Sequence, residues 1–197
     1  RAGHTVTVFE RHDEIGGLLR YGIPNFKMEK HIIDRRIAIL KAEGIIFKTN
    51  VNVGVDYDIK NLDSFDSIVL CGGATKTRSL PTPGIDAIGV VQAMTFLTQQ
   101  TKVVLEKPIE NQILATDKNV IVIGGGDTGS DCIGTSNRQG AKTVVNFEIM
   151  PKPPGHRSPT TPWPFWPLKL KTSSSHQEGV ERNWLINTKE FVKDDDG

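Results

Sequence analysis

The sequence has few cysteines and no long apolar run, and each of these absences excludes a class of protein. Only Cys71 and Cys132 occur, without the CxxC spacing of a zinc site or a redox dithiol. We therefore predict no metal site and expect both thiols to be buried and reduced, as in a cytoplasmic protein. No apolar stretch approaches the roughly 20 residues of a membrane span. The start of the chain does not resemble a signal peptide.

An excess of either charge is also missing. The 24 lysines and arginines are balanced by 23 aspartates and glutamates, which gives a net charge of +1. This balance argues against nucleic acid or a membrane as partner. With 197 residues, of which 37% are hydrophobic, the chain is long enough to bury one or two cores.

The segment "KNVIVIGGGDTGSDC" carries the strongest signal that is present. The apolar run from Val120 to Ile123 predicts a strand buried on both faces of a parallel sheet. A G-x-G-x-x-G pattern follows at Gly124, Gly126 and Gly129. Its glycines permit a tight turn, close approach of the backbone to a pyrophosphate, and close packing of helix on strand. We predict a helix over 127–138, whose N-terminus favours phosphate.

The context of this turn is that of a dinucleotide-binding unit. Gly140 ends the helix, and "KTVVNFE" predicts a second strand that closes on the acid Glu148. An acid about 20 residues after the glycines is placed to bind a ribose hydroxyl. The alternative is a purely structural glycine turn.

A short internal repeat indicates a second unit of the same kind. "RQGAKTVVNFE" (138–148) matches "RAGHTVTVFE" (1–10), where the run from Thr5 to Phe9 predicts a strand ending on Glu10. The second copy follows a glycine-rich turn, so the first copy should follow one too, and that turn would precede residue 1. We therefore expect the first unit to be incomplete; chance similarity is the alternative. The fold class is then α/β, with two Rossmann-like dinucleotide-binding domains of a flavoprotein pyridine-nucleotide oxidoreductase.

Other segments complete the expected organisation. A helix is predicted over 28–43, with Ile33, Ile37 and Leu40 on one face, and another over 92–100. Further strands are predicted at 45–48, 51–55 and 67–71, the last running into Gly72, Gly73 and Ala74, where ligands bind in open α/β sheets. We place the domains at 1–86 (FAD) and 87–197 (NAD(P)H), with the boundary after "LPTPG". The stretch "MPKPPGHRSPTTPWPFWP" predicts a loop whose aromatic residues pack on a neighbouring surface or stack on a ring.

These residues resemble one family over nearly the whole chain. The segments "GGLLRYGIPNFK", "TNVNVGVD", "GGATKTRSLPTPG", "VIVIGGGDTGSDCIGTSNRQGA", "FEIMPKPP" and "TPWPFWPLKLKTSSSHQEG" are similar to the small (β) chain of bacterial NADPH-dependent glutamate synthase. The resemblance implies hydride transfer from NADPH to FAD. It also implies electron flow through iron–sulfur clusters, whose ligands are not in this chain, to a large (α) subunit that forms two glutamates from glutamine and 2-oxoglutarate.

The resemblance also implies which residues bind the cofactors. Those expected to bind FAD are Glu10, Arg11, Gly16, Gly17, Leu18, Lys27, Val51, Gly72, Gly73, Ala74 and Thr75. Those expected to bind NADPH are Gly124, Gly125, Gly126, Asp127, Thr128, Gly129, Glu148 and Arg157.

We name no catalytic side chain, because hydride transfer between two rings needs contact and exclusion of water rather than an acid or a base. Glu148 by itself favours NADH, whereas Lys152, His156 and Arg157 could hold the 2′-phosphate of NADPH. Two other functions stay open. One is a stand-alone NAD(P)H:flavin oxidoreductase with another acceptor, and the other is an inactive nucleotide-binding fragment.

Overall fold

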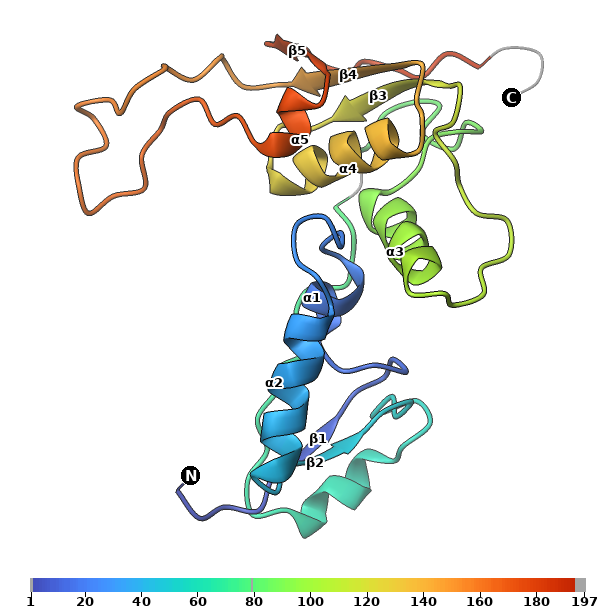
Figure 1. Ribbon diagram of the computed structural model, residues 1–197, viewed down its shortest axis with the longest axis vertical. Coiled ribbons are helices and arrows are strands. Elements are labelled where there is room, and N and C mark those ends of the chain that lie inside the picture. The colour runs from blue at the N-terminus through green and yellow to red at the C-terminus, as the bar shows by residue number, and fades with distance from the viewer. Residues whose placement is uncertain (1, 79, 194–197) are drawn as a thin grey trace. The chain divides into compact units, whose positions relative to one another are not determined.

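The computed structural model describes residues 2–78 and 80–193, which separate into two compact units (Figure 1). The first unit comprises the residues up to 78 together with 104–106, and the second comprises the remainder. No helix among the described residues has the length and apolar character to span a bilayer.

The first unit is built on a two-stranded parallel sheet. Strand β1 (Thr7–Phe9) pairs with β2 (Ile46–Lys48), with Val8 opposite Phe47. The crossover between them contains α1 (Gly17–Tyr21) and α2 (His31–Ala42), and a 3-10 helix, η1 (Ile59–Ser64), follows β2. Within α2, Ile33 is buried and Ile37 and Leu40 are half-buried, so the predicted apolar stripe is confirmed. Gly44 follows the helix with φ of 92°.

The prediction of two further strands in this unit is wrong for the described residues. At 51–55 the chain forms a turn, in which Asn52 N donates to Asp56 Oδ1 at 2.7 Å and only Val53 makes an isolated bridge, to Tyr57. Residues 67–71 are extended but form no strand, and Val69 and Leu70 are 81% and 90% exposed. A strand needs a hydrogen-bonded neighbour, and among the described residues this apolar segment has none.

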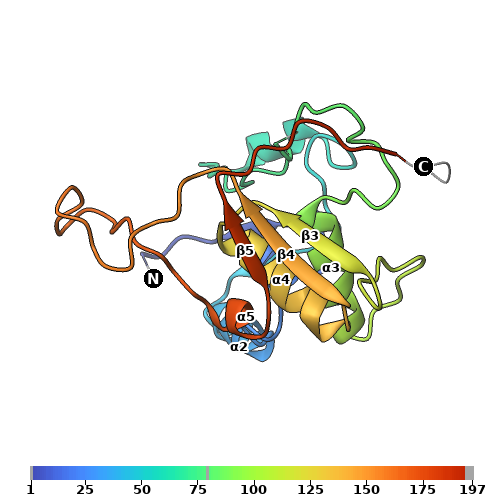
Figure 2. The ribbon, with the colours of Figure 1, turned by 90° about the horizontal axis from the view of Figure 1, so that it is seen from above.

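The second unit is a three-stranded parallel sheet with helices on one face. The strand order is β3 (Asn119–Ile123), β4 (Thr143–Glu148), β5 (Glu181–Trp184). Figures 1 and 2 show α3 (Ala93–Val104), α4 (Asp127–Arg138) and α5 (Ser174–Gln177) on the same side of this sheet. The core between the layers contains Leu97, Val122, Cys132, Ile133 and Val144.

The other face of β3 is open. Ile121 and Ile123 are 58% and 46% exposed, so burial of this strand on both faces is wrong for the described residues. The prediction followed from the unbroken apolar run, whereas in the structure helices cover only the face that carries Val122.

The segment after residue 79 packs within the second unit. Phe191 N donates to Pro83 O at 2.9 Å, and Lys193 Nζ lies 2.8 Å from Asp86 Oδ2. A Cβ on Gly84 would lie 2.0 Å from Phe191 O, so the two segments are in close contact. The change from the first compact unit to the second comes before Leu80, and the division into an FAD domain and an NAD(P)H domain at 86 stays a prediction.

Candidate functional site

The glycine-rich turn connects β3 directly to α4. Gly124 has φ of 115°, and Gly126 is the N-cap of α4 and offers no side chain to its first amides. A Cβ on Gly129 would lie 2.2 Å from Gly124 O, so only glycine allows the helix to pack this closely on the turn. The exposed N-terminus of α4, beside Asp127 and Thr128, is therefore shaped for an anionic group.

Glu148 lies against this turn. A Cβ on Gly125 would lie 2.1 Å from Glu148 Oε2, so the glycine makes room for the carboxylate. The other oxygen, Oε1, accepts a hydrogen bond from Met150 N at 3.2 Å. The structure thus brings Glu148 and Gly125 together, although they are 23 residues apart in the sequence.

A residue that the sequence analysis missed holds the turn in place. Asn146, 2% exposed in β4, donates from Nδ2 to Val122 O at 2.9 Å and to Gly124 O at 3.0 Å. Gly124 N in turn donates to Phe147 O at 2.8 Å. An asparagine among the apolar residues of "TVVNFE" was the available signal, because a buried amide needs hydrogen-bond partners.

Two cations and a tryptophan lie beside Glu148 at the carboxyl end of the sheet. Trp184 stands opposite Glu148 in the register of β4 and β5. Lys152 Nζ lies 4.8 Å and Arg182 Cζ 5.1 Å from the centroid of the Trp184 ring. Burial lowers the pKa of the Arg182 guanidinium, and the Glu148 carboxylate acts in the opposite direction. We call Lys152, Arg182 and Trp184 the cation–tryptophan cluster; only Lys152 had been considered from the sequence.

Arg157, which was expected from the sequence to bind NADPH, lies on the loop that follows this cluster. Its NH1 group lies 3.5 Å from Thr161 O, on the exposed loop after β4, and no hydrogen bond or ion pair joins it to Glu148 among the described residues.

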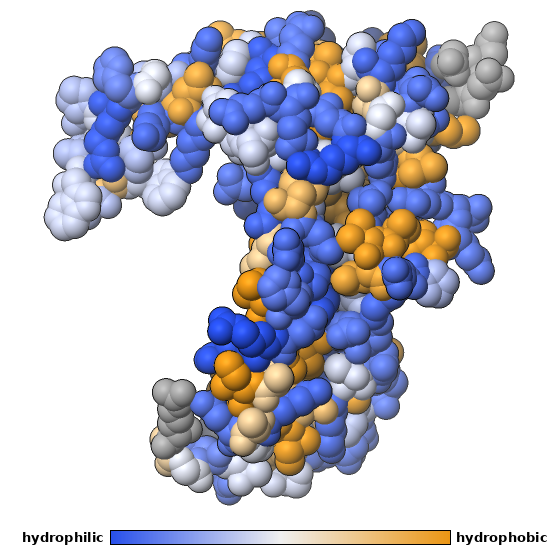
Figure 3. Space-filling view, in the orientation of Figure 1, coloured by the Kyte–Doolittle hydropathy of each residue, from blue (hydrophilic) through white to orange (hydrophobic). Residues whose placement is uncertain are grey.

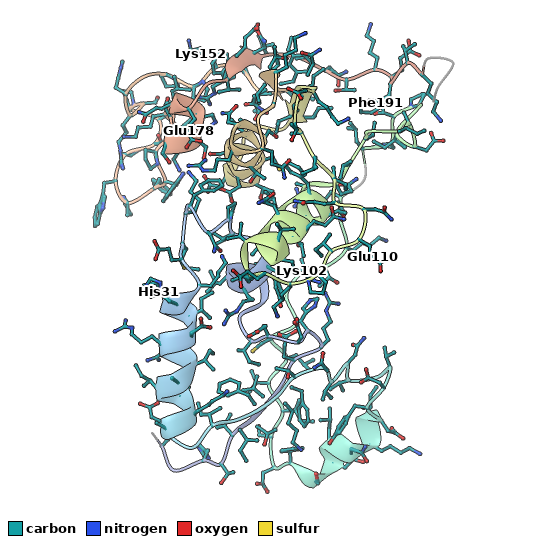
Figure 4. The ribbon with its side chains drawn as sticks, turned by 45° about the vertical axis from the view of Figure 1, so that its right-hand side comes forward. His31, Lys102, Glu110, Lys152, Glu178 and Phe191 are labelled. Carbon is teal, nitrogen blue, oxygen red and sulfur yellow. The ribbon has the colours of Figure 1, made fainter. Side chains whose placement is uncertain are left out.

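Figure 4 labels Lys152 after β4 and Glu178 at the end of α5. Glu178 forms an ion pair with Arg138, which fixes α5 to α4.

In the first unit, the end of β1 meets the segment after β2. Glu10 Oε1 accepts a hydrogen bond from His12 N at 2.9 Å, and Val51 N donates to Glu10 O at 3.0 Å. Two of the residues expected to bind adenosine, Glu10 and Val51, are thus adjacent. Arg11, which lies between Glu10 and His12, is exposed.

The glycine pair after β1 is held by buried polar side chains. Gly16 and Gly17 have φ of 129° and 51°, and a Cβ on Gly16 would lie 3.2 Å from Arg20 Cβ. Arg20, 4% exposed, donates from Nε to Ile15 O at 3.1 Å and pairs with Asp34 at 2.5 Å. The turn is therefore rigid, and Leu18 projects from it with 63% exposure.

The remaining residues expected to bind FAD are not gathered around this turn. Gly72, Gly73, Ala74 and Thr75 are exposed in a segment without regular secondary structure, and among the described residues no hydrogen bond joins them to Glu10 or Leu18. Lys27 is exposed, with Nζ 5.9 Å from the Phe26 ring centroid. Of the residues expected to bind FAD, Glu10 and Val51 are thus joined by a hydrogen bond, whereas Lys27 and residues 72–75 lie elsewhere on the surface of the first unit.

Comparison with known proteins supports the resemblance. No family model matches the chain. It is 54% identical over 99% of its length to the NADPH glutamate synthase small chain of Mycobacterium tuberculosis, and 45% identical over 100% to that of Bacillus subtilis. It spans 41% and 42% of those proteins, about two fifths of their length.

The fold has counterparts among solved structures. Mycobacterium tuberculosis FprA in complex with NADPH superimposes with a TM-score of 0.59 at 21% identity, covering 74% of this chain and 37% of FprA. This likeness, with the parallel sheets, confirms the Rossmann-like α/β class. The resemblance inferred from the sequence is also confirmed: over nearly its whole length, this chain is similar to a part of the NADPH glutamate synthase small chain.

Proposed function

We propose that this chain is part of an electron-input subunit of glutamate synthase, which takes a hydride from NADPH and passes it to FAD. The observation that carries the proposal is the glycine turn packed against Glu148, in a chain 54% identical to a small chain of that enzyme. The electrons would then reach a large chain, through iron–sulfur clusters whose ligands lie outside this sequence, and convert glutamine and 2-oxoglutarate to two glutamates.

The second unit would bind NADPH. The backbone at Gly124 and Gly126, where a Cβ would meet nothing within 4 Å, is open to a diphosphate, and the N-terminus of α4 would supply its amides. Glu148 is placed to accept from a ribose hydroxyl. The cation–tryptophan cluster beside it would hold the 2′-phosphate, since two cations there offset the repulsion from the carboxylate.

The first unit would contribute one side of the FAD site. Glu10 and Val51 would meet the adenosine, and the rigid turn at Gly16 and Gly17 would let the main chain pass the diphosphate. When bound, FAD accepts the hydride and releases its electrons singly. For this step the chain supplies position and exclusion of water, so we assign no acid–base residue.

Calorimetric titration of the chain with NADPH and then NADH tests the proposal. We expect NADPH to bind more tightly. A preference for NADH would overturn the cofactor assignment, and failure of both to bind would favour an inactive fragment. Glutamate formation on adding a large chain to the full-length small chain separates this function from an oxidoreductase with another acceptor.

A further inference from the structure

A long loop between β4 and α5 projects from the second unit and carries three large aromatic side chains on its surface. We call residues 150–171 the arm; it is the orange loop in Figure 1 and the pale and blue projection in Figure 3. Trp163, Phe165 and Trp166 are 83%, 66% and 75% exposed. Tryptophan and other aromatic residues are enriched at the centres of protein interfaces, where they supply much of the binding energy.

The arm is held in shape by its own hydrogen bonds. Leu170 N donates to Pro154 O at 2.7 Å and closes its base. Nearer the tip, Leu168 N donates to Thr161 Oγ1 at 3.2 Å, and Thr161 N donates to Ser158 O at 3.0 Å. Four prolines, at 159, 162, 164 and 167, restrict the backbone further. These restraints lower the conformational entropy that the tip would lose on binding.

The arm also concentrates positive charge. No aspartate or glutamate occurs between Glu148 and Glu178, whereas Lys152, Arg157, Lys169 and Lys171 all lie in this interval and are exposed. Lys171 Nζ lies 4.0 Å from the centroid of the Trp166 ring, so cation and aromatic surface occur together. The complementary surface therefore combines carboxylates with an apolar recess.

This pattern favours a protein as the occupant over a nucleic acid. The net charge of the whole chain is only +1, so the molecule has little general attraction for a phosphate backbone. Exposed tryptophan and phenylalanine instead match the composition of protein interface cores, and the lysines beside them suit the polar rim around such a core.

We propose that the arm is a docking surface for the large chain, which receives the electrons. The face of the large chain that meets the arm would carry carboxylates around an apolar recess. This inference rests on the proposed function, because it is that function which supplies a large chain as partner. The aromatic tip would enter the recess, while Lys169 and Lys171 pair with carboxylates around it.

The test measures association of the chain with the purified large chain of the Mycobacterium tuberculosis enzyme by sedimentation velocity, at low and at moderate salt. Two double variants are compared, Trp163→Ser with Trp166→Ser, and Lys169→Glu with Lys171→Glu. The charge reversal Lys118→Glu, at an exposed site before β3, is the matched control. We expect each double variant to weaken association by about tenfold or more and the control to change it by less than about twofold. NADPH affinity, measured by calorimetry, should stay unchanged in all three.

Several results would overturn the inference. One is that both double variants associate with the large chain as tightly as the unaltered chain does. Another is that the unaltered chain does not associate with the large chain at about 10 μM. A third is that the arm binds single-stranded RNA, anionic lipid vesicles or a second copy of this chain. In the full-length small chain, the Arg157–Ser158 and Lys171–Thr172 bonds should be cut by trypsin until the large chain is added. Protection without the large chain would show that the small chain covers its own arm. Loss of NADPH binding in the unaltered chain would instead overturn the proposed function.

Discussion

The ammonium group of Lys30 lies 3.0 Å from the carbonyl oxygen of Leu19, with only 3% of the lysine exposed. The same group donates to Met28 O at 3.3 Å and to Ile23 O. One buried side chain thus ties together the loop that connects the glycine pair to α2. Its cost of burial is offset because the ammonium group donates to three carbonyl oxygens.

Replacing Lys30 by methionine should destabilise the first unit. Three carbonyl groups would lose their donor, so we expect the free energy of unfolding of this unit to fall by about 2–4 kcal/mol. Hydrogen exchange of the α2 amides would report the change, while emission of Trp163, Trp166 and Trp184, all in the second unit, should keep its unfolding midpoint. Lys41→Met, at an exposed position of α2, is the control and should leave α2 exchange unchanged.

The variants Gly129→Ala and Gly126→Ala should distinguish an effect on stability from an effect on NADPH binding. The Cβ at 129 would lie 2.2 Å from Gly124 O, so this variant should lose about 2–3 kcal/mol of stability in urea denaturation. A Cβ at 126 meets nothing within 4 Å, and stability should stay within about 0.5 kcal/mol. If the turn binds a diphosphate, Gly126→Ala should nevertheless weaken NADPH binding about tenfold in calorimetry. Unchanged affinity would argue against the site.

Removal of Lys152 should affect the two nicotinamide cofactors differently. A cation held on the Trp184 ring beside Glu148 would contact only the 2′-phosphate, so Lys152→Ala should weaken NADPH binding about fivefold and leave NADH within about twofold. The effect should shrink as salt is raised. Equal losses for both cofactors would place Lys152 outside the phosphate site. Glu148→Gln should act in the opposite direction and raise the ratio of NADPH to NADH affinity.

The two thiols should differ sharply in reactivity. Burial raises the pKa of Cys132 from its ordinary value of 9.0 to about 12, with Asp131 adding to the effect. Cys71 is exposed, so the expectation that both thiols are buried is wrong for this residue. A thiol reagent at pH 8 should modify one cysteine per native chain and two in denaturant. The Cys71→Ser variant identifies the fast site, and rapid native labelling in that variant would contradict the assignment.

The same shift in the Cys132 pKa gives a pH dependence of stability. Above pH 9 the unfolded chain loses this proton while the folded chain keeps it, so the free energy of unfolding should fall as the pH rises toward 12. Cys132→Ala should remove this contribution, although it also creates a small cavity.

The predictable parts of the molecule are those whose structure depends on local sequence. The helix over 127–138 was predicted to the residue, because glycines bound it on both sides and β-branched strands flank it. Segment 67–71 was predicted wrongly, because a strand depends on a neighbour that the local sequence does not contain. Asn146 and Arg182 were missed for a related reason: their roles follow from the register of β4 with β3 and β5.

The exposed apolar segment at 68–70 should affect the solubility of the chain at high concentration. Ile68, Val69 and Leu70 are 52%, 81% and 90% exposed in an extended backbone, with no proline or charge among them. Such a segment adds readily to a strand of another molecule, so concentrated preparations should precipitate through it. The variant Leu70→Lys would act as a gatekeeper and improve the yield of soluble chain without touching the core around Leu97 and Ile133.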